Sequence, residues 1–375
     1  MAAEDTAPLP PPPPHGFEAA EHVKSFKDRI IPKQTDDVTV YWSRATILAI
    51  FIAGVLAIIC ESWIMINENW LINNVKAASP DGYNDLEENF LVGQTYHGIF
   101  LAAFLFWMIV TWDGVMHKNL MQVLSVNIYN FGLLVYSFLQ IIQTKTDLEF
   151  VRPQLENPDD PIASNTGLFL FAQVMLPAII GFVIPSFAYL TYRLHGEFGW
   201  RQYRITGGSK QLENVFFTYH ILLLLLKFSV FFVIGFTIFD LVLTAVSDKG
   251  KVIIGISAAV VGILVPACGY YGARNERKHL IFLYMFGCLC VLAYIVQRVW
   301  QAYYKEYETP ESSYFDRSKL PFMLYACLSF LLVLVAFVYG FICLGNFNRG
   351  LKEVLDQEEK RRKGELEAPV VDLDA

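Results

Sequence analysis

The sequence predicts an all-α, polytopic integral membrane protein with eight transmembrane helices and both termini in the cytosol. Composition is the first reason, because 54% of the 375 residues are hydrophobic and only 17% are charged, against about a quarter charged in soluble domains. The second reason is length, since eight apolar stretches reach or approach the roughly 20 residues of a spanning helix. The third is positive charge, which gathers in alternate loops, as in proteins that keep basic loops cytosolic.

The first 43 residues are polar and contain a proline-rich run that begins at Pro8 and ends at Pro14. Proline fixes φ and lacks a backbone donor, so the run is expected to adopt extended polyproline II conformation. Two interpretations stay open. The run is either a disordered spacer or a ligand for a cytosolic partner with an SH3- or WW-type groove.

Residues 44–345 form the predicted transmembrane domain. Its second apolar stretch is the shortest, and its fifth is longer than a straight crossing requires, which indicates a tilted helix or a first turn in the interface. Residues 346–375 follow as a charged tail that we expect in the cytosol. The eight predicted spans are 44–66, 96–112, 120–143, 167–192, 216–246, 252–273, 278–300 and 321–345.

The orientation is predicted from the lysines and arginines of the connecting segments. With both termini inside, the inner segments hold 19 lysines and arginines and the outer loops hold eight. The outer loops also hold 15 acidic residues, so the entire net charge of −7 faces the lumen or exterior. A seven-span alternative that omits the second stretch would place the termini on opposite sides and mix the basic loops, so we reject it.

Composition and motifs argue against several classes of function. A net charge of −7 without a basic face does not suit nucleic-acid binding. All six cysteines lie inside apolar stretches, so we expect neither disulfides nor a metal site. The motifs of nucleotide-binding proteins, hydrolases and zinc proteases are missing, and no cofactor is expected. An enzymatic activity would need a set of residues that these motifs do not describe.

Four ionisable residues lie within the predicted spans: Glu61, Lys227, Asp240 and Arg298. Each would cost roughly 2.5–3.5 kcal/mol at the centre of a lipid-exposed helix, so each should face protein or water. In the predicted orientation Glu61, Asp240 and Arg298 lie near the outer ends of their helices. There Arg298 can pair with Glu61, with Asp240 or with both, as a structural ion pair or as the gate of a functional site.

Lys227 lies toward the inner half of the fifth span and needs other partners. Asn127, Tyr129 and Asn130 of the third span lie at a comparable depth, and His220 lies two turns earlier on the helix of Lys227. These residues form the predicted intramembrane polar site, for an anionic ligand, a lipid headgroup or a proton-coupled switch. The alternative is a lysine whose ammonium group reaches the nearby interface.

Short aromatic and basic motifs mark the fifth span, the loop before it and the start of the first span. They are Gly199-Trp200-Arg201-x-Tyr203, Leu226-Lys227-Phe228, Phe231-Phe232-x-x-Gly235-Phe236, and Tyr41-Trp42 with Arg44. With these motifs the chain resembles an uncharacterised fungal family of multi-pass membrane proteins of the Golgi apparatus. The resemblance implies a multi-span helical fold in the Golgi or a related endomembrane. It implies no catalytic residues.

Two functional hypotheses from different classes remain. The first is a transporter-like or lipid-handling protein, favoured by the ionisable residues and by prolines within the fourth and sixth spans. The second is a non-transporting membrane scaffold or cargo-sorting factor that acts through its cytosolic segments. A polar cavity of roughly a few hundred Å³ around Lys227 would favour the first hypothesis, and solid packing would favour the second.

Overall fold

The computed structural model describes residues 37–78, 83–151, 166–245, 249–304 and 313–362. All of the secondary structure in these ranges is helical, and eight of the helices are long and apolar enough to cross a membrane. The predicted all-α, eight-span fold is therefore confirmed. The proline-rich run from Pro8 to Pro14 and residues 363–375 lie outside the described residues. The helices are α2 (Asp37–Ala78), α3 (Tyr83–Met116), α4 (Leu120–Val151), α6 (Thr166–Thr206), α7 (Lys210–Ala245), α8 (Lys249–Arg274), α9 (Lys278–Tyr304), α10 (Ser313–Gly345) and α11 (Leu351–Arg362).

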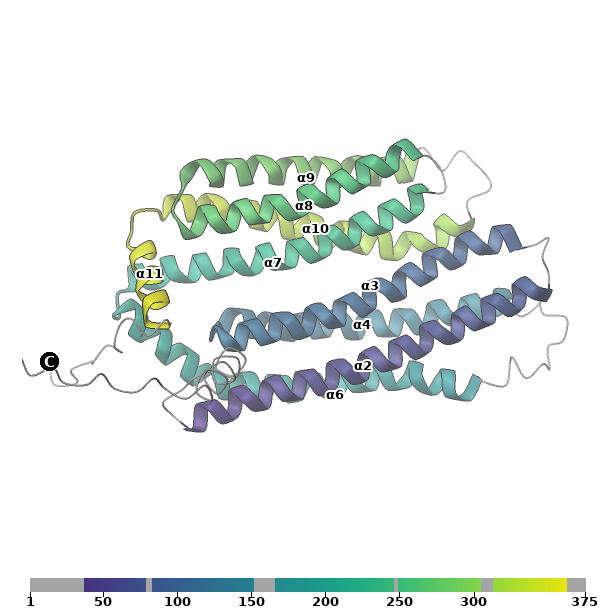
Figure 1. Ribbon diagram of the computed structural model, residues 1–375, viewed down its shortest axis with the longest axis horizontal. Coiled ribbons are helices and arrows are strands. Elements are labelled where there is room, and N and C mark those ends of the chain that lie inside the picture. The colour runs from purple at the N-terminus through teal and green to yellow at the C-terminus, as the bar shows by residue number, and fades with distance from the viewer. Residues whose placement is uncertain (1–36, 79–82, 152–165, 246–248, 305–312, 363–375) are drawn as a thin grey trace, which may run out of the picture.

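The eight long helices form two four-helix rings that lie side by side (Figure 1). In the first ring α2, α3, α4 and α6 each pack against the next helix, and α6 packs back against α2. The second ring repeats this arrangement with α7, α8, α9 and α10. Fewer contacts join the rings, chiefly those that α7 makes with α3, α6 and α4. Each ring has its own hydrophobic core, so the protein consists of two packed halves with a thinner interface.

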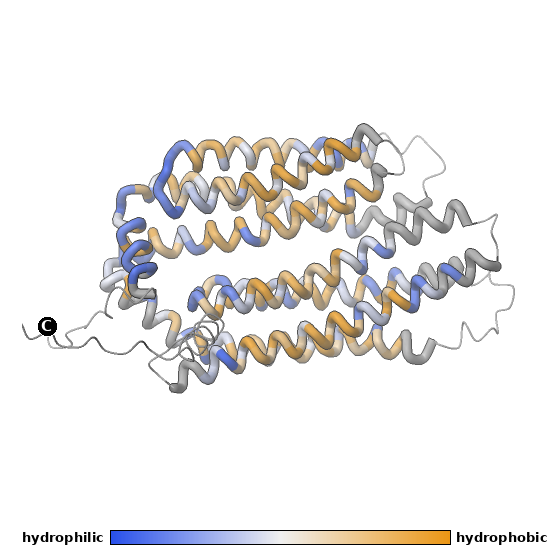
Figure 2. The backbone as a smooth tube through the Cα atoms, viewed as in Figure 1, coloured by the Kyte–Doolittle hydropathy of each residue, from blue (hydrophilic) through white to orange (hydrophobic). Residues whose placement is uncertain are grey.

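The helices extend beyond the apolar stretches that predicted them. The shortest predicted span, 96–112, belongs to a helix of 34 residues whose apolar part runs from Gly93 to Met116. Figure 2 shows hydrophobic residues along the middle of the helices and hydrophilic residues toward the ends. The helix α6 continues through Pro177 and Pro185, and α8 continues through Pro266. These helices therefore tolerate the missing proline donors without ending.

Large apolar side chains cover the outer surface of the bundle. Ile128, Phe182 and Phe286 expose 78%, 75% and 66% of their surface, fractions that would be costly in water. In a bilayer the acyl chains contact such side chains, while polar groups turn inward. Buried polar residues such as Glu61 and Asn130, both fully buried, follow this pattern.

Glycines allow α8 to approach its neighbours closely. A Cβ atom added to Gly262 would lie 2.9 Å from Val233 of α7, and one added to Gly269 would lie 2.9 Å from Tyr284 of α9. Small residues of this kind bring membrane helices into contact, because lipid supplies little hydrophobic drive between helices.

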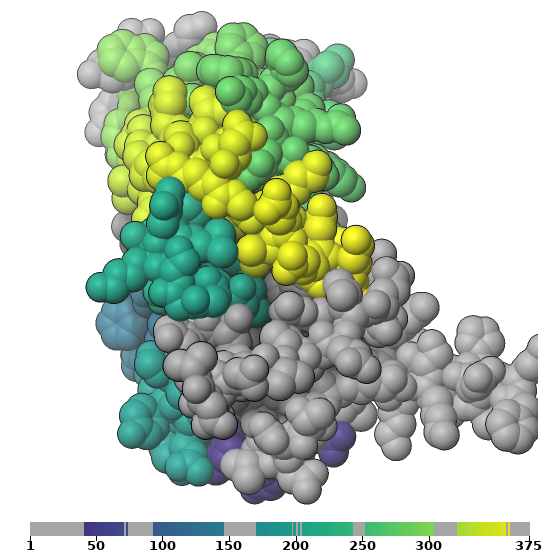
Figure 3. Space-filling view, turned by 90° about the vertical axis from the view of Figure 1, so that its left-hand side faces the viewer, coloured from purple at the N-terminus to yellow at the C-terminus, as the bar shows by residue number. Residues whose placement is uncertain are grey.

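The short helix α11 lies across one end of the bundle (Figures 1 and 3). Its Leu351 and Leu355 are buried in the core of the second ring. The first residues of α2 lie at the same end (Figure 1), which we call the α11 end. A turn through Gly207 and Gly208, with φ values of 59° and 73°, joins the two rings there. Such left-handed conformations favour glycine, which has no Cβ.

Candidate functional site

A polar cavity of about 300 Å³ lies at the α11 end, where the two rings meet. Of the α7 residues that line the cavity, Lys227 lies furthest from the start of the helix. The turn between α3 and α4 forms one wall, and α6, α8 and α11 contribute others. Its polar lining residues are Asp113, His117, Lys118, Asn119, Gln122, Gln202, Tyr219, His220, Lys227, Tyr270, Arg274 and Glu359.

Lys227 binds two side chains of the first ring. Its ammonium group donates to the Asp113 carboxylate and to Gln122 Oε1, the latter at 2.9 Å. Gln122 also donates from Nε2 to Asp113 Oδ2 at 2.7 Å. The three side chains thus form a closed network, in which the charge of Lys227 is balanced by Asp113 while 37% of the lysine side chain stays exposed.

Among the described residues, Lys227 binds Asp113 and Gln122 and not the third-span residues that the sequence suggested. Asn127 donates to Thr191 Oγ1 at 3.1 Å, and Tyr129 donates to the Ala103 carbonyl at 3.1 Å. Asn130 is fully buried, and neither atom of its amide has a hydrogen-bond partner among the described residues. It lies eight residues beyond Gln122, or about 12 Å along α4, which is too far for contact with the lysine.

His220 lines the same cavity as Lys227 without binding it. Its Nδ1 lies 3.1 Å from Asn119 Nδ2, so it contacts the first residue before α4. Asn119 also accepts a hydrogen bond from the Gln122 backbone at 3.3 Å. This is the contact of a helix N-cap, which satisfies a backbone donor in the first turn.

The tight turn between α3 and α4 positions Asp113 and Gln122. Lys118 has a φ of 51°, and the Asn119 backbone donates to the Gly114 carbonyl at 2.8 Å, so α3 ends in a left-handed turn. A Cβ at Gly114 would lie 3.2 Å from the Gln122 side chain. Glycine at that position therefore lets Gln122 lie against α3, where it reaches both the Val110 carbonyl, at 2.8 Å, and Asp113.

Basic residues dominate the charge that the transmembrane helices present to the cavity. These helices and their turns contribute three cations to the lining, Lys118, Lys227 and Arg274. The anion that they contribute is Asp113. The second acid of the lining, Glu359, comes from α11 and binds Arg274. A negatively charged group could replace the Glu359 carboxylate at Arg274, because a guanidinium binds carboxylates and phosphates alike.

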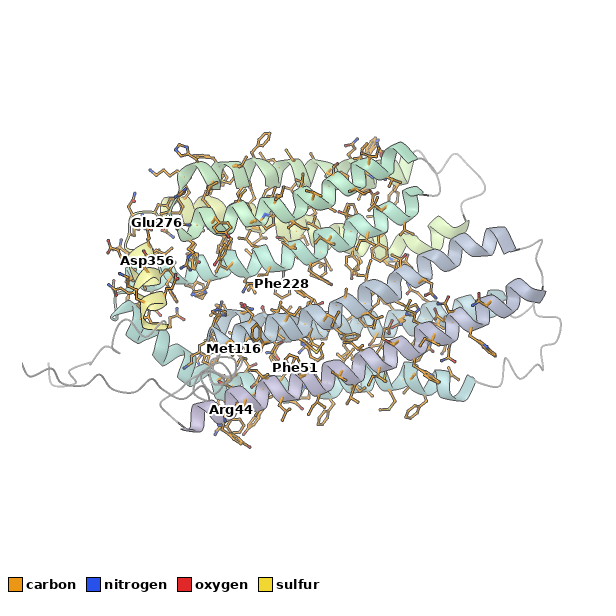
Figure 4. All side chains as sticks on the ribbon, viewed as in Figure 1. Arg44, Phe51, Met116, Phe228, Glu276 and Asp356 are labelled. Atoms are coloured by element: carbon orange, nitrogen blue, oxygen red, sulfur yellow. The ribbon has the colours of Figure 1, made fainter. Side chains whose placement is uncertain are left out.

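Aromatic rings fill the interface beyond Lys227. Phe228 points from α7 toward α3 and α4 (Figure 4) and contacts Tyr129, with ring centroids 5.6 Å apart. Phe231 stacks on Phe106 of α3, with centroids 4.5 Å apart and planes inclined by 15°. Phe232 contacts Tyr325 of α10 at 5.7 Å. This cluster separates the cavity from the opposite end of the bundle.

At the opposite end, Arg298 pairs with Asp240 and not with Glu61. Its Nε donates to both oxygens of Asp240, at 2.6 and 2.8 Å, and Tyr294 donates to the same carboxylate at 2.6 Å. Of the pairings left open for Arg298, the structure therefore has the one with Asp240, and Glu61 belongs to the other four-helix ring. It binds His97 instead.

The Glu61 carboxylate is fully buried and lies in a second polar cluster. His97 contacts Glu61 through Nδ1 and Glu68 through Nε2, both at 2.6 Å. Gln140 donates to both oxygens of Glu61 at 3.0 Å, and Thr144 donates to Glu68 at 3.2 Å. Sequence reasoning identified Glu61 but missed His97 and Glu68, although Glu61 and Glu68 are seven residues apart and share a helix face.

A larger cavity lies elsewhere, on the outer surface between α9 and α10. It has a volume of about 860 Å³ and is lined mainly by apolar side chains, among them Val296, Trp300 and Leu331. Since none of the described residues that line it is charged, we assign it to acyl chains of the surrounding bilayer rather than to a site.

Comparison with known proteins agrees with the predicted resemblance. Over 272 residues the chain is 21% identical to a UPF0658 Golgi apparatus membrane protein of Schizosaccharomyces pombe, and the match covers 68% of this chain and 76% of that relative. No protein-family model matches the chain, and no solved structure matches it. The expected resemblance to a fungal family of Golgi membrane proteins is confirmed, and with it the Golgi or related endomembrane location and the multi-pass membrane character.

Proposed function

We propose that this protein binds a phosphate-bearing anion in the cavity around Lys227 and handles lipids or transports the anion through the interface between its two rings. The observation that carries the proposal is the cavity itself: about 300 Å³ lined by Lys227, Arg274 and other polar groups that converge at the end of the interface. Ligand cavities typically have this size and a few convergent polar groups.

The architecture supports this function over a scaffold. Two helical halves that meet at a polar site can move against each other, which is how many transporters expose one site to alternate sides. The aromatic rings of Phe106, Phe228 and Phe231 block the path beyond the site, as an occluding layer should. A scaffold that acts through its tails requires neither the cavity nor the blocked interface.

The positive-inside rule assigns the α11 end to the cytosol in this proposal. The cavity then opens toward the cytosol, at the level of lipid headgroups. Both a lipid phosphate and free phosphate reach that position, and both suit Arg274 and Lys227.

Ligand binding tests the proposal. The full chain is reconstituted in nanodiscs of zwitterionic lipid and titrated with short-chain phosphatidic acid and, separately, with inorganic phosphate. Arg274→Gln removes one cation, and we expect at least about tenfold weaker binding, because a hydrogen bond to a charged group contributes about 1.5–3 kcal/mol. Arg277→Gln is the matched control, since Arg277 is exposed three residues away and does not line the cavity.

The two probes separate the sources of phosphate. Binding of phosphatidic acid alone indicates a lipid headgroup, and binding of both probes indicates a site for phosphate itself. The proposal fails if neither probe binds, or if Arg274→Gln and Arg277→Gln weaken binding equally. Lys227→Met is tested together with Asp113→Asn, because the single change would leave Asp113 without its counter-charge.

A further inference from the structure

The contacts of His97 require two protons. Each ring nitrogen lies 2.6 Å from a carboxylate oxygen, one from Glu61 and one from Glu68. A contact of that length needs a hydrogen between nitrogen and oxygen, because two lone pairs would repel. A neutral imidazole carries only one ring proton. The second proton is therefore bound by the cluster, and imidazole is a stronger base than a carboxylate, so we place it on the ring.

The cluster suits a proton better than a metal ion. The two carboxylates bind opposite nitrogens of one imidazole ring, so they cannot converge on a common ion without displacing His97. Within the described ranges, no group of three or more His, Cys, Asp and Glu side chains could hold a metal. With a doubly protonated ring the cluster has a net charge of −1, which becomes −2 when the second proton leaves.

A polar face of α4 runs from this cluster toward the Lys227 cavity. Gln140 binds Glu61 at one end, and Gln122 binds Lys227 at the other. Between them Asn130 and Ser137 are at most 1% exposed. At ~100° per residue, these side chains and Thr144 fall within about a quarter of the helix circumference, over ~33 Å of its length. This length is close to the thickness of the hydrocarbon core.

Asn130 gives the polar face a second, independent indication of function. Its amide is completely buried, and neither its oxygen nor its nitrogen has a partner among the residues that the structure describes. Trp107, on α3 of the same four-helix ring, also has a buried Nε1 without a hydrogen-bond acceptor among the described residues. Buried amides and indoles in such surroundings ordinarily bind internal water, and water at Asn130 would lie midway along the polar face.

We propose that Glu61, His97 and Glu68 form a proton-binding site, and that the polar face of α4 couples its occupancy to ligand binding at the Lys227 cavity. The ligand of the new site is a single exchangeable proton. The coupling rests on the function proposed above, whereas the proton site does not.

Among the described side chains, the other ionisable groups on the helices around the cluster are cysteines and tyrosines or are already paired. Cys60 precedes Glu61 on α2, Tyr96 lies beside His97 on α3, and Tyr136 of α4 and Tyr325 of α10 interact electrostatically with the site or with one another. On α7, Asp240 is held by Arg298 and Tyr294. The ionisable side chains described for α6, from Tyr189 to His195, lie toward the α11 end. The positive charge of the doubly protonated His97 ring is thus balanced by the carboxylates of Glu61 and Glu68.

Nitrogen NMR of the full chain, labelled at the histidine ring nitrogens, tests the proton site without any ligand. At neutral pH we expect both ring nitrogens of His97 to carry protons, with its signal identified by its loss in His97→Gln. Glu61→Gln removes one of the two charges and should leave one ring proton, whereas His279→Gln, at an exposed position, should not change the His97 signal. A singly protonated His97 ring in the unaltered protein would overturn the site.

Calorimetry tests the coupling. Short-chain phosphatidic acid is titrated into the nanodisc-bound protein in buffers of different protonation enthalpy, which gives the number of protons exchanged on binding. The phosphate monoester exchanges protons of its own, because its second pKa is about 6, so we expect the number to change in His97→Gln and to stay unchanged in His279→Gln. One linked proton changes the affinity by up to about tenfold per pH unit. An unchanged number of exchanged protons in His97→Gln overturns the coupling alone. If neither phosphatidic acid nor inorganic phosphate binds, the proposed function and the coupling both fail, and the NMR result still decides the proton site.

Discussion

The buried ion pair between Arg298 and Asp240 in the second four-helix ring allows a quantitative test of how much the stability of the fold depends on the pairing of these charges. Arg298 and Asp240 expose only 11% and 7% of their side chains, and two hydrogen bonds of 2.6 and 2.8 Å join them. Arg298→Met leaves the Asp240 carboxylate buried without its cation. Breaking a buried pair from one side typically costs about 3–5 kcal/mol, whereas replacing both partners is often close to neutral. We therefore expect Arg298→Met to lower the free energy of unfolding by about 3–5 kcal/mol. The double variant Asp240→Asn/Arg298→Met should lower it by less than about 2 kcal/mol.

The free energy of unfolding is measured by steric trapping of the full chain in bicelles. Arg277→Gln is the control, because a change at an exposed position usually stays within about 0.5 kcal/mol. Tyr294 can still donate to the amide oxygen in the double variant, so little polarity is left unpaired. The reasoning is refuted if Arg298→Met is as stable as the control, or if the double variant loses as much as the single one.

Three further predictions concern packing, the α11 end and topology. Gly287→Ala should cost about 1–3 kcal/mol of unfolding free energy, because its Cβ would overlap Val265 of α8, while Gly181→Ala, which faces open space, should cost nothing. Leu355→Asp puts a charge into the contact between α11 and the bundle, so trypsin should cleave α11 at least about tenfold faster, which equals about 1.4 kcal/mol of easier opening. Tags at the two termini should both be digested by protease added to sealed Golgi vesicles, and protection of either one would contradict the predicted topology.

The fold class could be predicted because the bilayer imposes its length on the sequence. Eight apolar stretches correspond to eight crossing helices, and no knowledge of packing is needed to count them. The two-ring arrangement could not be predicted. It depends on which faces approach each other, and most spanning helices are largely apolar on both their lipid side and their protein side, so periodicity identifies no unique buried face.

The polar partners were harder to predict than the charged residues themselves. Asp113 seemed to belong to a loop because the apolar stretch ends at Trp112, yet α3 continues to Met116 and keeps Asp113 inside the helix. His97 was missed because its partners Glu61 and Glu68 lie on another helix, 36 and 29 residues away. Such contacts depend on the rotation of each helix about its axis, which composition does not specify.

The joint between the two rings has a consequence for how the polypeptide is built. Each ring closes on itself with four crossings, and only the turn at Gly207 and Gly208 carries the chain from one to the other. Two separately translated fragments, divided at that turn, would each insert with a complete set of neighbours. Reunion of the fragments would bring Asp113 and Gln122 of one against Lys227 of the other, so restored phosphate binding would report their assembly.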